Sequence, residues 1–152
     1  MDSGTSNWPI KIGQKLKRRQ LHALVGGAFQ WGITSCMQRS AMLVFNNPKK
    51  AREFGYDRWE GWQPNGEFHY TGQGPIGDQD IATRSNNSLL RSKARGIPVH
   101  LFRSEGTEVT YLGLFELGEN PYRWERAPDQ LGNNRKVVVF HLVQVETDHA
   151  RD

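Results

Sequence analysis

The sequence contains a single cysteine, Cys36, and this scarcity excludes several kinds of site. One thiol cannot form an internal disulfide, and without a second cysteine no zinc site of the Cys-x-x-Cys kind can be built. We expect Cys36 to be a small buried apolar residue in a reducing compartment such as the cytoplasm.

Long apolar runs are also missing. No window approaches eighteen apolar residues, and the opening MDSGTSNWP lacks the apolar stretch of a signal peptide. We therefore expect no membrane partner. The 152 residues suit one domain with a real core, and we expect a flexible leader at 1–10, a folded domain at 11–146 and a charged tail at 147–152.

Catalytic motifs are the third absence. The sequence shows no HNH-type histidine cluster, no nuclease carboxylate pair followed by Glu-x-Lys, and no deaminase His-x-Glu with Cys-x-x-Cys. The nearest approaches to metal ligands lie at 67–69 and 78–80, and we interpret them as strand and turn residues because supporting partners at ligand-like spacing are lacking. We expect no catalytic residues, no metal and no cofactor.

Positive charge is concentrated in the first third of the chain. Residues 1–52 hold nine basic side chains against one acid, whereas the other 100 residues hold eleven basic and fifteen acidic groups. Such asymmetry indicates a polyanionic partner such as nucleic acid, and a solvated basic helix is the alternative.

The stretch 54–77 (FGYDRWEGWQPNGEFHYTGQGPIG) combines aromatic rings, acids and glycines. Rings, a carboxylate and bare backbone are what a pocket for a flat, hydrogen-bonding ligand requires, and a nucleobase is such a ligand. Hairpins of an ordinary small β domain are the alternative interpretation.

Hydrophobic patterning predicts an α+β chain that is mainly β. We expect a helix over 13–27, a short helix within 78–96, and strands at 41–45, 67–71, 98–103, 109–117, 122–125 and 137–145. The turn spacings favour antiparallel pairing in a barrel or strongly curved sheet.

Three groups of side chains are suited to touching a nucleic acid backbone or entering a groove. The first helix offers four basic side chains to phosphates: Lys15, Lys17, Arg18 and Arg19. A second polar and basic surface follows the pocket stretch: Arg84, Asn86, Asn87, Arg91, Lys93 and Arg95. Gln30 and Trp31, just past a double glycine, are candidates for a wedge into a duplex, although Trp31 can equally fold inward.

Landmarks in colinear order carry a family resemblance. They are Gly26-Gly27, Gly32-Ile33, the strand AMLVF, Phe68-His69-Tyr70-Thr71-Gly72-Gln73-Gly74, Gly77-Asp78, Asn86-Asn87, Leu89-Leu90, Gly96-Ile97-Pro98-Val99, Tyr111-Leu112-Gly113 and the strand 137–145. The chain resembles the SRA (SET- and RING-associated) or YDG domain family, most closely the bacterial SRA-like domains found with HNH endonucleases.

The resemblance implies a PUA-like SRA β-barrel, a curved antiparallel sheet with short flanking helices. It implies a non-catalytic reader that binds double-stranded DNA and flips 5-methylcytosine or 5-hydroxymethylcytosine into an aromatic pocket. A bacterial, nucleoid-associated location and a nuclease partner in a modification-dependent restriction system belong to the same expectation.

The resemblance also assigns pocket residues. Tyr70 corresponds to one stacking ring, and Thr71 and Gly72 to backbone groups at the base edge. The second ring and the carboxylate come from the loop upstream, where this sequence departs from the family in length. We prefer Trp59 or Trp62 for the ring and Glu60, then Asp57, for the acid, with Tyr56 as a rival ring.

Other functions remain open on the sequence. A PUA-like module that binds RNA or unmodified nucleic acid is the first alternative, and an endonuclease subunit is the second. A small-molecule or protein-interaction module with an incidental basic face is a third.

Overall fold

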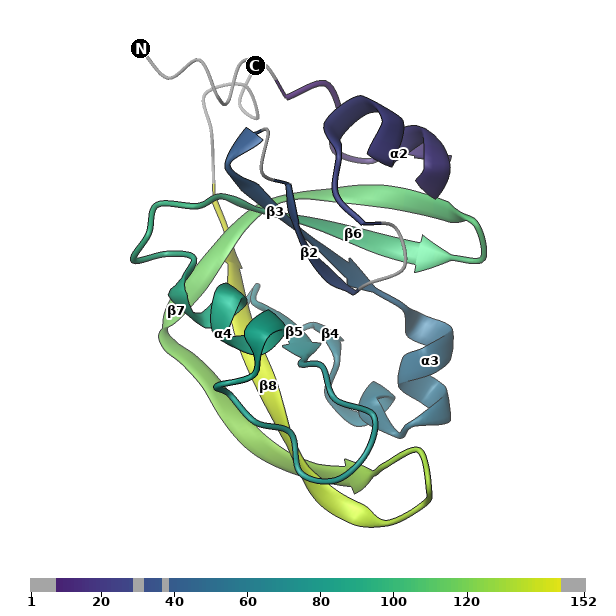
Figure 1. Ribbon diagram of the computed structural model, residues 1–152, viewed down its shortest axis with the longest axis vertical. Coiled ribbons are helices and arrows are strands. Elements are labelled where there is room, and N and C mark those ends of the chain that lie inside the picture. The colour runs from purple at the N-terminus through teal and green to yellow at the C-terminus, as the bar shows by residue number, and fades with distance from the viewer. Residues whose placement is uncertain (1–7, 29–31, 37–38, 146–152) are drawn as a thin grey trace.

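Eight strands make one curved sheet in the computed structural model, which describes residues 8–28, 32–36 and 39–145 (Figure 1). The strand order is β2-β3-β6-β7-β8-β5-β4, and β1 pairs with β7 outside this path. Among these residues, no helix is both long enough and apolar enough to cross a membrane.

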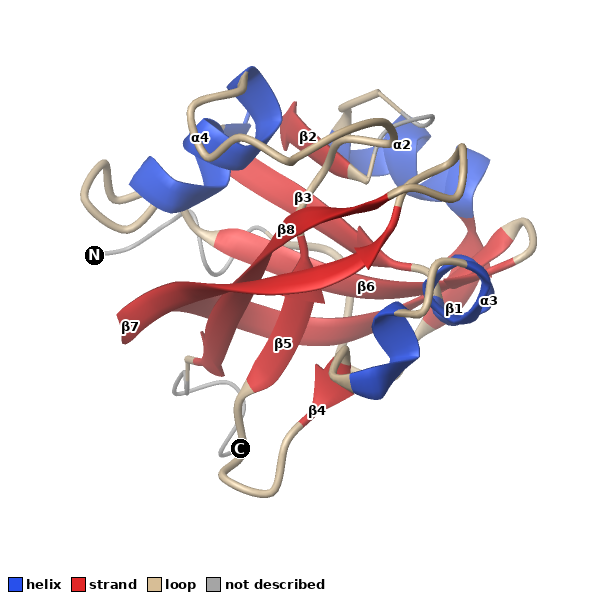
Figure 2. Ribbon diagram, turned by 90° about the horizontal axis from the view of Figure 1, so that it is seen from below, coloured by secondary structure: helices blue, strands red, loops and turns tan. Residues whose placement is uncertain are grey.

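The strands alternate with a few short helices. The strands are β1 (Lys15–Lys17), β2 (Ile33–Cys36), β3 (Ala41–Asn46), β4 (Gly61–Trp62), β5 (Phe68–Thr71), β6 (Val99–Glu105), β7 (Glu108–Pro128) and β8 (Asn134–Gln144). The helices are α2 (Arg18–Val25), α3 (Pro48–Glu53), the 3-10 helix η2 (Tyr56–Arg58) and α4 (Arg84–Arg91). In Figure 2, α2 and α4 lie above the strands and α3 lies at their side.

The expected mainly β fold with a curved sheet and short helices is confirmed, but the sheet is not a closed antiparallel barrel. Strands β2 and β4 end the strand order, and β3 pairs with β6 in parallel. Parallel strands need a long crossover, and here the connection carries α3, η2, β4, β5 and α4. The candidate pocket stretch is therefore part of this crossover.

Strand β3 separates two apolar cores. All six of its residues are buried, as expected for a strand covered on both faces. Met42 and Val44 belong to the larger core with Tyr70, whereas Leu43 and Phe45 belong to a second core under α2. The predicted strand at 41–45 is confirmed.

The predicted helix over 13–27 is wrong at its start. Residues Lys15–Lys17 form β1 and pair antiparallel with Glu108–Thr110, so the helix begins only at Arg18. Leu21 and Val25 are its buried residues, whereas Leu24 is 53% exposed. Strand pairing with β7 outweighs the helical periodicity of this segment.

The two strands expected at 109–117 and 122–125 are one long strand, β7. The break expected between them is instead an irregularity at which the register against β8 shifts between Leu117 and Tyr122. Because β8 continues past this point, β7 bends without leaving the sheet. The strands predicted at 67–71, 98–103 and 137–145 are confirmed as β5, β6 and β8.

Candidate base-binding site

Strand β5 sends successive side chains to opposite faces of the sheet. Phe68 and Tyr70 enter the larger apolar core. His69 and Thr71 face the other way, and His69 lies opposite His141 of β8. One four-residue strand therefore supplies two different polar clusters.

Tyr70 is almost fully enclosed, with 3% of its surface exposed. Its hydroxyl oxygen accepts a hydrogen bond from Nε2 of Gln73 at 3.0 Å. Burial raises the pKa of Tyr70, and the charge of Glu60 raises it further, so the phenol is neutral. A Cβ at Gly32 would lie 2.9 Å from this hydroxyl, so Gly32 packs directly against it.

Glu60 is partly buried, and its carboxyl is held by two neutral donors. Its Oε1 accepts from the backbone N–H of Thr71 at 3.0 Å, and its Oε2 accepts from Nδ2 of Asn46 at 2.5 Å. Burial raises the pKa of Glu60, although both hydrogen bonds lower it. Asn46 was not predicted as a site residue, because its sequence signal is only that of a strand end.

Tyr56 belongs to the same group of residues. Its hydroxyl accepts from a terminal nitrogen (NH2) of Arg135 at 2.7 Å. Burial raises the pKa of Tyr56, Arg135 lowers it and the charge of Glu60 raises it, while Tyr56 in turn acts on the pKa of Tyr70. We call Tyr56, Glu60, Tyr70 and Thr71 the Glu60 cluster.

The other candidates from the upstream loop lie differently. Trp59 donates its Nε1–H to the hydroxyl of Thr71 at 3.0 Å. Trp62 is 49% exposed and packs edge-on against Phe68. Asp57 is exposed on η2. Among these candidates, Glu60 is the acid that contacts Thr71, and Tyr56 and Trp59 are the rings that lie beside it.

Gly72 is fixed by its surroundings. Its N–H donates to the carbonyl of Val138 at 2.8 Å, and its own carbonyl accepts from Nε2 of Gln79 at 2.8 Å. A Cβ at this position would lie 2.5 Å from Cγ1 of Val138 and 2.7 Å from Oδ1 of Asn86. Any ligand that reaches the N–H groups of Thr71 and Gly72 must therefore replace bonds within the chain.

Asn86 supports this loop and does not lie on a basic surface, so that expectation is wrong. The residue is fully buried. Its amide accepts from the N–H of Gln73 at 2.8 Å and donates to the carbonyls of Gln73 at 3.0 Å and Asp80 at 3.1 Å. Asparagine is suited to this role because one side chain both donates and accepts.

The predicted phosphate-binding residues near the N-terminus divide into two kinds. Lys15, Lys17 and Arg19 are exposed, on β1 and α2. Arg18 instead lies over the ring of Phe45 at 3.7 Å and donates its Nε–H to His22 at 3.1 Å. Burial lowers the pKa of Arg18 to about 10. The exposed lysines are therefore better placed than Arg18 to meet a phosphate.

On and just after α4, the basic side chains of Arg84, Arg91 and Lys93 are exposed. Lys93 lies 3.4 Å from a carboxylate oxygen of Glu116. The wedge candidates Gln30 and Trp31 lie outside the residues that the structure describes.

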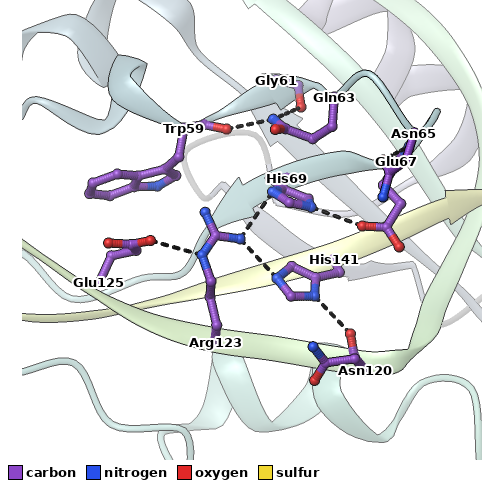
Figure 3. Close-up of polar contacts among 10 residues, drawn as sticks. All are labelled: Trp59, Gly61, Gln63, Asn65, Glu67, His69, Asn120, Arg123, Glu125 and His141. Atoms are coloured by element: carbon purple, nitrogen blue, oxygen red, sulfur yellow. Dashed lines mark hydrogen bonds and ion pairs between the residues drawn. The ribbon is translucent and has the colours of Figure 1, made fainter.

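A second polar cluster lies further along β5, on the face that His69 shares with Thr71 (Figure 3). One terminal nitrogen (NH1) of Arg123 lies 3.1 Å from Nδ1 of His69 and 2.9 Å from Nε2 of His141. The Nε2 of His69 is 2.9 Å from Glu67, and the Nδ1 of His141 is 2.8 Å from the carbonyl of Asn120. We call Glu67, His69, Arg123 and His141 the Arg123 cluster.

The hydrogen-bond roles in the Arg123 cluster follow from its guanidinium, which can only donate. Both imidazoles must therefore accept from Arg123, so His69 donates to Glu67 and His141 donates to the Asn120 carbonyl. The Nε–H of Arg123 donates to Glu125 at 2.8 Å, which completes the network.

This arrangement bears on metal binding. Glu67, His69 and His141 offer ligand atoms that lie within 4.8 Å of one another. His141 is 72 positions from His69, so nothing in the sequence indicates that it joins the other two. Cross-strand pairing of β5 with β8 brings it there. Arg123 donates to the ring nitrogen of each imidazole that carries the free lone pair, and a metal would need that same lone pair. We therefore interpret the cluster as a structural network and assign no metal to it.

Comparison with solved structures gives the fold a context. The chain matches the sulfur binding domain and SRA domain of ScoMcrA complexed with phosphorothioated DNA at 17% identity and a TM-score of 0.70, covering 91% of this chain and 41% of that one. It matches the Type IV phosphorothioation-dependent restriction endonuclease ScoMcrA at 18% identity and a TM-score of 0.72, covering 91% of this chain and 29% of the endonuclease. The chain thus spans well under half of either ScoMcrA chain.

A further match is to the SUVH5 SRA domain in a complex with hemi-methylated CG DNA. The identity is 23%, the TM-score is 0.62, and 92% of each chain is covered. A search of curated proteins gave no match. The family model described as the ScoMcrA-like SRA domain matches residues 12–152, and the chain therefore belongs to the SRA domain family.

Proposed function

We propose that this domain is a non-catalytic reader of modified duplex DNA, which takes a flipped 5-methylcytosine or 5-hydroxymethylcytosine into the Glu60 cluster. The observation that carries the proposal is the buried Glu60 carboxyl, held against the backbone of Thr71 and close enough to raise the pKa of Tyr70. A carboxyl enclosed among aromatic rings matches the edge and the faces of a nucleobase.

Cytosine offers an amino donor and a ring-nitrogen acceptor on its pairing edge. Glu60 can accept from the amino group, and its raised pKa favours a protonated carboxyl that can donate to the ring nitrogen. Stacking contributes about 1–3 kcal/mol for a base, and extrusion costs a few kcal/mol. Ring stacking and edge contacts therefore roughly offset the cost of flipping.

Affinity for any duplex comes from the exposed basic side chains. Lys15 and Lys17 lie on β1, Arg19 lies on α2, and Arg84 and Arg91 lie on α4. Such contacts release counterions, so binding weakens as salt rises.

Partial coverage of the ScoMcrA endonuclease supports a wider role. We propose that the domain supplies the specificity of a modification-dependent restriction system, with cleavage performed by a nuclease partner. It acts in this proposal on the bacterial nucleoid in the cytoplasm.

The experiment is an anisotropy titration at one near-physiological salt concentration. One duplex is prepared with cytosine, 5-methylcytosine, 5-hydroxymethylcytosine, or cytosine with a phosphorothioate linkage. Burying the 5-methyl group contributes about 0.8 kcal/mol, so we expect the methylated duplex to bind at least roughly fourfold more tightly than the plain one.

The other outcomes are equally informative. Preference for the phosphorothioate alone would contradict the base pocket and indicate that the protein recognises a modified DNA backbone. Equal binding of all four duplexes would contradict modified-base reading, and tighter binding of an RNA hairpin would favour the RNA-binding alternative.

A further inference from the structure

Arg135 is the largest of the side chains that are almost fully buried, with 2% of its surface exposed. No carboxylate lies within ion-pair distance of it in the described part of the chain. Removing a guanidinium from water without a charged partner is costly. Its contacts must therefore matter to the fold or to the site.

The contacts of Arg135 join segments that are distant in sequence. One terminal nitrogen (NH1) donates to the carbonyls of Gly74 at 2.6 Å and Gly77 at 2.9 Å. The other (NH2) donates to the Tyr56 hydroxyl at 2.7 Å. Arg135 of β8 thus holds both the Gly74–Gly77 loop, which follows the pocket residues in sequence, and the ring of Tyr56, which precedes them.

Tyr56 packs against the apolar side chains of Ala127, Val137 and Val139, which leave its ring free to slide unless the hydroxyl is held. It begins η2, a helix of only three residues, after Gly55 in the left-handed conformation. Its ring lies 5.6 Å from that of Phe54 and 6.0 Å from that of Trp59, measured between centroids. The hydrogen bond from Arg135 is the polar contact that ties this ring to the sheet.

The partners of this contact come from distant parts of the chain. Tyr56 and Arg135 are 79 positions apart, and the Gly74–Gly77 segment lies between them in sequence. A base pocket gains from a 5-methyl group only if its wall fits closely, because a wall that can shift leaves part of that group in contact with water.

We infer that Arg135 is a positioning residue for modified-base specificity, which acts by holding the ring of Tyr56 and the Gly74–Gly77 loop in fixed relation. The inference rests on the proposed function. It assigns no contact between Arg135 and the base.

The test removes the hydrogen bond and keeps the ring. Tyr56→Phe deletes the hydroxyl that accepts from Arg135, and Tyr122→Phe is the matched control, since Tyr122 is a partly buried tyrosine on β7. Affinities for methylated and plain duplexes are measured by anisotropy. We expect Tyr56→Phe to reduce the methyl preference from at least roughly fourfold to less than about twofold, and Tyr122→Phe to keep the wild-type preference.

A double-mutant cycle identifies the route. If Arg135 acts through Tyr56, Arg135→Lys combined with Tyr56→Phe loses no more methyl preference than the larger of the two single losses. Additive losses would overturn the inference, as would a wild-type preference retained in Tyr56→Phe. Thermal melting of each variant shows whether it is folded, and Tyr56→Phe alone decides the matter if Arg135→Lys does not fold.

The proposed function and the inference about Arg135 can be contradicted separately. Equal binding of methylated and plain DNA by the wild-type protein overturns the proposed function and the inference together. A wild-type preference that survives Tyr56→Phe overturns the inference alone.

Discussion

The Glu60 cluster and the Arg123 cluster flank the same strand but are built in opposite ways. In the Arg123 cluster, a guanidinium donates to two imidazoles, and each imidazole donates in turn to an oxygen acceptor. In the Glu60 cluster, a buried carboxyl accepts from a backbone N–H and an asparagine amide, both neutral. The first arrangement is complete without a ligand, whereas the second keeps an acid whose proton affinity is raised by burial.

The difference indicates separate roles for the two clusters along β5. A complete network stabilises the pairing of β5, β7 and β8, and its loss should affect folding and not recognition. An acid beside aromatic rings should affect recognition. Variants in each cluster can test this division.

The largest effect is expected at the pocket loop. Gly72→Ala places a Cβ 2.5 Å from Val138 and 2.7 Å from Asn86, so β8 or the Asn86 amide must move. We expect the free energy of unfolding to fall by about 1–3 kcal/mol or more, together with loss of methyl preference. Urea denaturation and the duplex titration measure the two effects.

Gly118→Ala is the control for that variant, because its Cβ would meet Val143 at 3.3 Å, a milder contact. A Gly72→Ala protein as stable and selective as the wild type would show that the loop is not tightly packed.

The next effect is expected at the Arg123 cluster. Arg123→Leu deprives His69 and His141 of the donor that they share. We expect a loss of about 1–2 kcal/mol in unfolding free energy, since the site is partly exposed, and an unchanged methyl preference. Arg126→Leu, in the same strand, should change stability by less than about 0.5 kcal/mol. A loss of methyl preference in Arg123→Leu would show that the two clusters are coupled.

The two clusters should also give opposite dependences of stability on pH. Burial lowers the pKa of His69 more than its hydrogen bond to Glu67 raises it. Below pH of about 6.5 the unfolded chain binds more protons, so this contribution is present above that pH and is lost as pH falls. Burial raises the pKa of Glu60, so its contribution declines as pH rises above about 4.3.

Chemical denaturation between pH 4 and 8 separates these contributions. His69→Gln should flatten the acid-side loss, and Glu60→Gln should flatten the decline above about pH 4.3. The acid-side loss will not vanish, because burial also lowers the pKa of His100, to about 3. Identical pH profiles for wild type and both variants would contradict the opposed roles of the two clusters.

The smallest effect is expected at an exposed lysine. Lys17→Ala should weaken methylated and plain duplexes alike and reduce the salt slope of binding by about 1. Lys17 is exposed on β1, where its Nζ reaches only the hydroxyl of Thr107, at 3.3 Å. A loss confined to methylated DNA would show that Lys17 belongs to the reading of the base.

Local patterns predicted much of this architecture. The apolar run of β3 and the alternation of β5 and β8 carry their structure in consecutive residues, so periodicity was enough to find them. Residues 15–17 have a helical pattern but form β1, because their partner in β7 lies about ninety residues away and leaves no local signal. Residues 118–121 (GENP) have the composition of a turn, but they form part of β7, which pairs with β8 on both sides of them.

The candidate site was predictable only in part. The Tyr70-Thr71-Gly72 motif and Glu60 come from one short stretch, and the structure brings them together. Asn46, Arg135 and His141 reach these clusters through strand pairing and the long crossover, which the sequence does not reveal. The sequence predicts that Arg18 binds phosphate, but its guanidinium packs on the ring of Phe45.

The central claim, that a modified cytosine leaves the duplex and enters the Glu60 cluster, is tested most directly by base unstacking. A duplex carries 2-aminopurine beside a single 5-methylcytosine, and its fluorescence is followed during titration with wild-type protein and with Glu60→Gln. We predict a rise in fluorescence with the wild type, because extrusion of the neighbouring base unstacks the probe, and a smaller rise with Glu60→Gln at equal saturation. Tight, methyl-selective binding by the wild type with no change in fluorescence would contradict the account.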